Sequence, residues 1–237
     1  MKSFLLIGQS NMAGRGDFSE VPEIINNKCF MMRNGRWVHM REPINPDRSI
    51  FSFYHSGVGL SASFADKYAR HFDEEVGLIP CADGGTSLCE WMPGEILFDN
   101  AVNNALLAKR TSEIAGILWH QGENECTNEN DAKTYKIRFI QIITELRKKL
   151  ENDNMPVIIG ELGDFIKSYP GLGKWADTVN QQLQETATEL KNCYIASSNG
   201  LTHRGDGLHF NSSSYRILGE RYFEAYLGGI SNGSNNL

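Results

Sequence analysis

Short apolar segments of strand length alternate with amphipathic segments of helical length along most of this 237-residue chain. The strand-like segments are residues 4–7, 77–82, 114–119, 157–160 and 193–196. The helix-like segments, with apolar residues at a spacing of three to four, are residues 60–72, 96–110, 130–150, 175–190 and 211–227. Strands that alternate with helices pair in parallel and are covered on both faces. The sequence therefore predicts an α/β fold with a five-stranded parallel sheet.

The domain organisation follows from the absence of breaks in this pattern. No internal repeat and no Pro- or Ser-rich linker divides the chain, so we predict one domain over residues 1–229. Residues 230–237 are rich in Gly, Ser and Asn, which is typical of a flexible tail. The least regular part is residues 17–56, predicted as a long excursion with a small hairpin at Asn34-Gly35.

Charge and cysteine content exclude several classes of partner. The net charge is −6, and no clustered basic face of the kind that binds nucleic acid is evident. No run of about 18 apolar residues indicates a membrane span. Five dispersed cysteines without a CxxC pair indicate a reducing environment. The N-terminal apolar run of residues 4–7 is too short for a secretion signal, so we expect a cytoplasmic protein.

Polar residues gather directly after the predicted strands. These segments are residues 8–16, 83–87, 120–124 and 161–164, and a further polar segment, 202–209, precedes the last helix. In parallel sheets covered by helices, ligands bind at the carboxyl ends of the strands. We therefore expect these segments to form one functional site.

The residue types in these segments are those of a serine hydrolase, which needs a nucleophile, a base, an orienting carboxylate and oxyanion donors. Ser10, at the junction of a strand and a helix, is the candidate nucleophile. His209 is the candidate base, and Asp206 lies three residues earlier across a turn that contains Gly207. The candidate oxyanion donors are the Ser10 N–H, an N–H of Gly84 or Gly85, and the side-chain amide of Gln121.

Four motifs in this order resemble the SGNH-hydrolase superfamily: Gly-Gln-Ser-Asn-Met at 8–12, Gly-Gly-Thr at 84–86, Trp-His-Gln-Gly-Glu at 119–123 and Asp-Gly-Leu-His at 206–209. Within it, they resemble the branch of sialate O-acetylesterases and carbohydrate esterase family 6 acetylxylan esterases. The resemblance implies a flavodoxin-like three-layer α/β/α sandwich with a five-stranded parallel sheet. It also implies release of acetate from acetylated sugars, either acetylxylan fragments or acetylated sialic acid.

The resemblance makes Ser10 the nucleophile, His209 the base and Asp206 the orienting acid. Its oxyanion position corresponds to Gln121, and of the two glycines we favour Gly85. Glu123, in the Gln-Gly-Glu motif, is the alternative acid. The motif neighbours and nearby side chains expected to contact substrate are Gln9, Asn11, Arg15, Trp91, Asn124 and Arg204. For Trp91 a place in the core, and for both arginines a structural role, remain open.

Two other functions remain as alternatives. Glu123 and Asp206 could act as the carboxylate pair of a glycosidase, and the fold could serve as a carbohydrate-binding module without turnover. The histidines and carboxylates near the motifs match no recognised zinc spacing, so we expect neither a metal nor an organic cofactor. The sequence makes no prediction of the oligomeric state.

Overall fold

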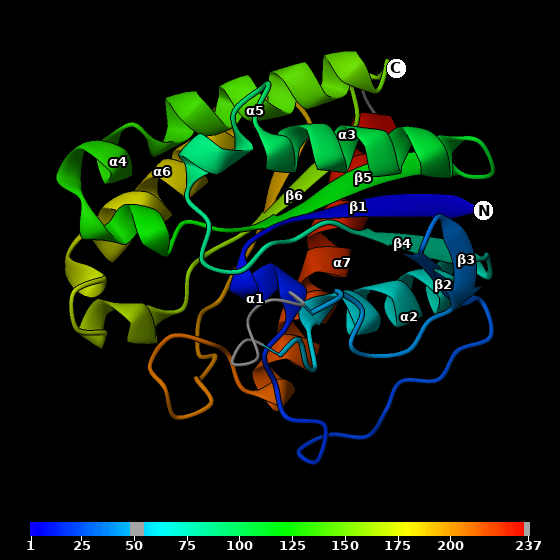
Figure 1. Cartoon of the computed structure of the whole chain (residues 1–237), viewed down its shortest axis with the longest axis horizontal. Coiled ribbons are helices and arrows are strands. Elements are labelled where there is room, and N and C mark those ends of the chain that lie inside the picture. Colours follow the sequence, from blue (N-terminus) through cyan, green and yellow to red (C-terminus); the bar gives the residue numbers. More distant parts are fainter. Residues whose placement is uncertain (48–54, 235–237) are drawn as a thin grey trace.

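The computed structural model describes residues 1–47 and 55–234, and its centre is a seven-stranded sheet in the order β3-β2-β4-β1-β5-β6-β7 (Figure 1). The strands are β1 (Lys2–Gly8), β2 (Cys29–Arg33), β3 (Arg36–His39), β4 (Val76–Pro80), β5 (Glu113–His120), β6 (Val157–Gly160) and β7 (Cys193–Ala196). All neighbouring strands pair in parallel except β2 and β3, which are antiparallel.

The five predicted strands are β1, β4, β5, β6 and β7, but the expected five-stranded parallel sheet is wrong in size and type. The predicted hairpin is β2–β3, and β2 extends the sheet by pairing with β4, so the sheet is mixed. Asn34 and Gly35 both have positive φ angles, 48° and 73°, as a tight hairpin turn requires. Local sequence therefore predicts the turn, whereas the pairing of Cys29 with Val76 depends on residues far apart in the chain.

Helices cover both faces of the sheet (Figure 1). They are α1 (Ser10–Ala13), α2 (Leu60–Phe72), α3 (Ile96–Lys109), α4 (Glu129–Lys133), α5 (Tyr135–Lys149), α6 (Ala176–Glu189) and α7 (Ser212–Ser234), with short 3-10 turns at Leu88–Trp91, Asn124–Thr127, Asp164–Ser168 and Gly173–Trp175. Alternate side chains of β1 point to opposite faces. Leu5 and Ile7 pack in the core under α3, α5 and α6, and Phe4 and Leu6 pack in the core against α2 and α7.

Two helices differ from their predicted lengths. The segment predicted as one helix over residues 130–150 is α4 and α5, with Thr134 between them. The Thr134 hydroxyl donates a hydrogen bond of 2.7 Å to the Asn130 carbonyl. The last helix, α7, continues beyond the predicted end at residue 227 to Ser234. Gly229 lies so close to the Tyr194 ring of β7 that a Cβ would come within 2.2 Å of it, which explains why a glycine there supports packing.

Within the part of the chain that the structure describes, no helix has both the length and the apolar character needed to cross a membrane. The predicted compartment stays a prediction.

The order of the strands creates a crevice at the carboxyl end of β1. The chain places β4 on one side of β1 and then places β5 on the other side. The connections that leave these strands consequently diverge, and such switch points are where ligands bind in open α/β sheets. The polar segments after β1, β4 and β5 meet there.

Candidate active site

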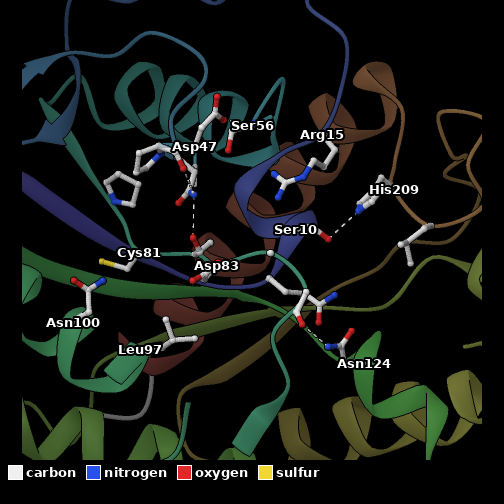
Figure 2. Close-up of a pocket in the computed structure, with 18 of the residues that line it drawn as sticks. Ser10, Arg15, Asp47, Ser56, Cys81, Asp83, Leu97, Asn100, Asn124 and His209 are labelled. Atoms are coloured by element: carbon white, nitrogen blue, oxygen red, sulfur yellow. Dashed lines mark hydrogen bonds between the residues drawn. The ribbon is translucent and has the colours of Figure 1, made fainter. Parts of the chain in front are cut away.

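Ser10, His209 and Asp206 form a continuous chain of hydrogen bonds. Ser10 is the first residue of α1, directly beyond the end of β1, and its Oγ lies 2.9 Å from His209 Nε2 (Figure 2). The other ring nitrogen, His209 Nδ1, lies 2.8 Å from Asp206 Oδ2. Because a carboxylate only accepts, Nδ1 carries the proton and Nε2 is free to accept the proton of Ser10. This is the arrangement of nucleophile, base and orienting acid in serine hydrolases.

The charge states of the two titratable groups suit these roles. Burial lowers the pKa of His209, Asp206 raises it, Arg15 and Arg204 lower it, and the net shift is downward. The imidazole is therefore neutral near pH 7 and can act as a base. Burial raises the pKa of Asp206, but hydrogen bonds from the His209 and Leu208 N–H groups and from the His209 ring outweigh burial and keep it below its usual value.

The loop that carries Asp206 and His209 is organised by its own hydrogen bonds. Asp206 Oδ1 accepts the N–H of His209 at 2.8 Å, so that one carboxylate binds both the backbone and the ring of this residue. His203 Nδ1 accepts the N–H groups of Gly205 and Gly207, each at 3.0 Å. Gly207 has a φ of 72°, a conformation that favours glycine. The three-residue spacing between Asp206 and His209 thus allows the two side chains to meet, because hydrogen bonds within the loop close the turn.

Asn11 lies beneath the site and holds the backbone on both sides of His209. Its Nδ2 donates to the Leu208 carbonyl at 3.1 Å, and its Oδ1 accepts the N–H of Phe210 at 3.3 Å. The same Nδ2 donates to Glu123 Oε1 at 2.5 Å. Asn11 is completely buried. The structure therefore places this predicted substrate contact under the loop that carries His209, where it holds the backbone on both sides of that residue.

Glu123, the alternative acid, lies away from the His209 ring. Its carboxyl is buried, contacts Asn11, and is 4.0 Å from the His120 Nε2 atom. Burial raises the pKa of Glu123 to about 7 and lowers the pKa of His120 to about 3. Glu123, which contacts Asn11, and the neutral His120 ring beside it fit a buried supporting cluster. The structure shows no contact between Glu123 and His209 in the described part of the chain.

The candidate backbone donors to the oxyanion are the N–H groups of Ser10 and of the two glycines in the β4–α3 connection. The first N–H groups of a helix have no acceptor within it, and Ser10 opens α1. A Cβ on Gly84 would lie 3.6 Å from the Ser10 Cβ, whereas a Cβ on Gly85 would have no neighbour within 4 Å. Both glycines line the pocket, and Gly84 is nearer to the nucleophile.

The side-chain amide of Gln121 is engaged elsewhere. Its Nε2 donates to the Thr86 carbonyl at 3.1 Å and to the Glu125 carboxylate, which uses both amide hydrogens. The residue is fully buried and lies behind the pocket wall. Asn124, three residues later, does line the pocket, and its Nδ2 donates one hydrogen to the Gly85 carbonyl at 2.6 Å. Asn124 therefore replaces Gln121 as the candidate side-chain donor at the pocket.

The candidate catalytic residues Ser10 and His209 open into a cavity of about 590 Å³, which is within the usual range for small-molecule sites. Among the predicted substrate contacts, Gln9, Arg15 and Asn124 line it. The cavity reaches from Ser10 and His209 at one end to Cys81, Leu97 and Asn100 at the other (Figure 2).

Trp91 and Arg204 are outside this lining. Trp91 is buried in the core, where its Nε1 donates to Thr86 Oγ1 at 3.0 Å and its ring meets the Trp119 ring edge-on. Arg204 donates to the Arg15 carbonyl, and its Nε lies 3.6 Å from Asp206 Oδ2. Both side chains therefore have structural contacts.

Several cavity residues were missed from the sequence. Asp83 lies three residues beyond β4, within the polar segment 83–87, so its place after a strand was an available indication. Asn45 and Asp47 come from the irregular excursion and Asn100 from the middle of the α3 surface, and no local pattern distinguishes them.

Comparison with known proteins decides the family. Residues 1–228 match the family model described as carbohydrate esterase, sialic acid-specific acetylesterase. The chain belongs to this family. It is thus a carbohydrate esterase of the acetylesterase type, as the resemblance to SGNH hydrolases and sialate O-acetylesterases predicted. Carbohydrate esterase family 6 and acetylxylan activity stay predictions.

Individual relatives agree with this assignment. The chain is 29% identical over 243 residues to a probable carbohydrate esterase of Arabidopsis thaliana, with coverage of 94% of this chain and 89% of the relative. The X-ray structure of that Arabidopsis protein superposes with a TM-score of 0.86 at 28% identity, covering 96% of this chain and 98% of that one. NanS, at 15% identity and a TM-score of 0.79 over 98% of each chain, shares the fold.

Proposed function

We propose that this carbohydrate esterase removes acetyl groups from sugar hydroxyls through an acetyl-Ser10 intermediate, with His209 as base and Asp206 as orienting acid. The observation that carries the proposal is the chain of hydrogen bonds from Ser10 Oγ through the His209 ring to Asp206. Its position at the edge of a cavity of about 590 Å³ supports a substrate larger than a simple acetyl ester.

In the first half of the reaction, Ser10 Oγ attacks the acetyl carbonyl carbon while His209 Nε2 accepts the hydroxyl proton. The carbonyl oxygen becomes an oxyanion near the N–H groups of Ser10 and Gly84 or Gly85. The imidazolium is stabilised by Asp206 and then protonates the departing sugar oxygen. The carbon–oxygen bond to the sugar breaks, and the acetyl group remains on Ser10.

In the second half, His209 Nε2 accepts a proton from water, and the resulting hydroxide attacks the acetyl-Ser10 carbonyl. The same donors stabilise the second oxyanion. His209 returns the proton to Ser10 Oγ as acetate leaves. The low pKa of His209 favours this cycle because the ring must be neutral at the start of each half.

Asn124 is proposed to supply the side-chain donor to the oxyanion. Replacing Asn124 with alanine is expected to lower kcat by about 10²-fold, because one preorganised donor is lost at the developing charge. Replacing Gln121 with glutamate tests the prediction from the sequence that Gln121 is the side-chain donor. Because the amide of Gln121 is a buried donor, its loss is expected to lower thermal stability. Steady-state kinetics with p-nitrophenyl acetate, together with thermal melting, compare the two variants. A kcat for Asn124→Ala equal to that of the parent contradicts this role.

The substrate class is tested by a panel of acetylated sugars. The candidates are acetylated xylo-oligosaccharides and acetylated sialic acid, with p-nitrophenyl acetate as a sugar-free ester. Acetate release from at least one sugar, and labelling of Ser10 by a serine-directed phosphonate, are expected; mass spectrometry locates the label. Folded protein that releases no acetate from any sugar and leaves Ser10 unlabelled would contradict the proposal.

No observation favours the glycosidase alternative. Glu123 is buried and absent from the described lining of the cavity, so it cannot reach a glycosidic bond together with Asp206. The binding-module alternative is set aside by membership in an esterase family.

A further inference from the structure

Three buried polar atoms of residues that line the catalytic cavity have no hydrogen-bond partner within the described residues. They are Gln9 Oε1, Arg15 Nε and Asn45 Oδ1. The three residues are only 2%, 8% and 6% exposed, and all three line the same cavity as Ser10. Buried polar groups are nearly always hydrogen-bonded, and leaving one unpaired costs free energy. Three such atoms on residues that line one cavity favour a ligand that supplies the missing partners.

The orientation of Asn45 is determined by its surroundings. Its Nδ2 donates to the Ala82 carbonyl at 3.0 Å and to the Pro46 carbonyl at 3.2 Å. An exchanged amide would bring Oδ1 against two carbonyl oxygens, so the amide nitrogen must occupy this place. Oδ1 is consequently an acceptor whose position is held by the loop beyond β4. A side chain held in this way can bind a ligand without losing further conformational freedom.

The chemistry of the three atoms specifies which part of an ester they can bind. Gln9 Oε1 and Asn45 Oδ1 need donors, and Arg15 Nε needs an acceptor. A sugar hydroxyl can donate and accept, whereas the methyl group of an acetyl ester can do neither. The cavity is also far larger than an acetyl group needs and extends beyond Ser10 toward Cys81 and Asn100 (Figure 2). The unpaired atoms therefore fit the sugar part of the substrate.

We propose that Asn45, together with Gln9 and Arg15, forms a subsite that binds free hydroxyl groups of the sugar ring, and that Asn45 determines substrate specificity. The subsite rests on the proposed function, because it assigns the sugar of an acetylated sugar to this cavity. Through Asn45, the subsite also adds part of the irregular segment 17–56 to a site otherwise built from the ends of strands and the loop before α7.

The experiment removes single hydroxyl groups from the substrate and one acceptor from the protein. The substrates are an acetylated methyl glycoside, its deoxy analogues and p-nitrophenyl acetate, and the readout is kcat/KM. In the parent protein, kcat/KM for one deoxy analogue is expected to be about tenfold lower than for the complete sugar. This is the size of the effect of one hydrogen bond to a buried partner. In Asn45→Ala, the same deletion is expected to have no further effect.

The control variant is Asn103→Ala, at an exposed position on α3 away from the cavity lining, which is expected to keep the parent's response to every deletion. If each hydroxyl deletion has the same effect in Asn45→Ala as in the parent, Asn45 does not bind the sugar and the proposal is overturned. If Asn45→Ala lowers kcat/KM equally for the glycoside and for p-nitrophenyl acetate, its role is structural, which also overturns it.

A binding measurement separates this proposal from the proposed function. The Ser10→Ala variant holds substrate without turnover, so calorimetry gives Kd for the same glycosides with and without Asn45→Ala. A hydroxyl-dependent loss of affinity that disappears in the double variant supports the subsite even if no hydrolysis is found. If the protein hydrolyses p-nitrophenyl acetate but Kd for the glycoside does not change when any hydroxyl group is removed, the subsite is rejected. The proposed esterase function then still stands.

Discussion

Replacing Ser10 with alanine is expected to lower kcat for p-nitrophenyl acetate by about 10⁴-fold or more, since removal of the nucleophile of a serine hydrolase has effects of this size. The variant should also lose labelling by a serine-directed phosphonate. Its fold should persist, because within the described residues the Ser10 hydroxyl has one side-chain partner, His209 Nε2. Burst kinetics and intact-protein mass spectrometry measure the two losses.

The matched control is Ser19→Ala, at an exposed serine whose hydroxyl contacts only Asp17 among the described residues. This variant should keep both kcat and labelling. A Ser10→Ala protein with an unchanged melting temperature and a kcat close to that of the parent would exclude Ser10 as the nucleophile. A loss of kcat that accompanies unfolding would call for the same measurement on Ser10→Gly.

Replacing Asp206 with asparagine is expected to lower kcat by about 10⁴-fold, while Glu123→Gln should leave kcat within a few-fold of the parent. An amide next to His209 Nδ1 no longer holds the productive tautomer or stabilises the imidazolium. In Glu123→Gln, the side-chain oxygen that accepts from Asn11 is kept, so the support beneath His209 remains. Rates with p-nitrophenyl acetate for the two variants decide which carboxylate orients the base.

The pH dependence of the free energy of unfolding tests whether Glu123→Gln removes the buried titrating group and leaves the fold intact. The folded protein holds the Glu123 proton up to a pKa of about 7, whereas the unfolded chain releases it near its ordinary value of 4.5. Between these values the unfolded state binds fewer protons, so the free energy of unfolding falls as pH rises. Glutamine does not titrate, so the variant should gain melting temperature relative to the parent above pH 7. A large loss of kcat in Glu123→Gln with that stability gain would make Glu123 a functional acid.

The sequence by itself determined the elements that carry the chemistry. The apolar segments at residues 4–7, 157–160 and 193–196 are strands of the sheet, and the helix predicted at residues 60–72 has the bounds of α2. The candidate catalytic residues also lie together, with Ser10 at the end of β1 and Asp206 one turn before His209. The elements and the spacing of Asp206 and His209 are local features, because apolar periodicity reports which side of an element is buried and a short turn fixes the distance between neighbours. The contact of His209 with Ser10, 199 residues away, depends on the tertiary fold.

Only the tertiary structure decided which motif residues face the cavity. Gln121, Glu123 and Trp91 belong to the same motifs or their surroundings as the catalytic residues, yet all three are buried behind it. Conversely, Asn45 comes from an irregular segment and reaches the cavity through its bond to the Ala82 carbonyl. The sequence pattern gives the type of residue at each position, but the direction of a side chain beyond a strand depends on contacts between segments far apart in the chain. Both groups are buried, and a place in the cavity lining separates the residues that a substrate can touch from those that support the site.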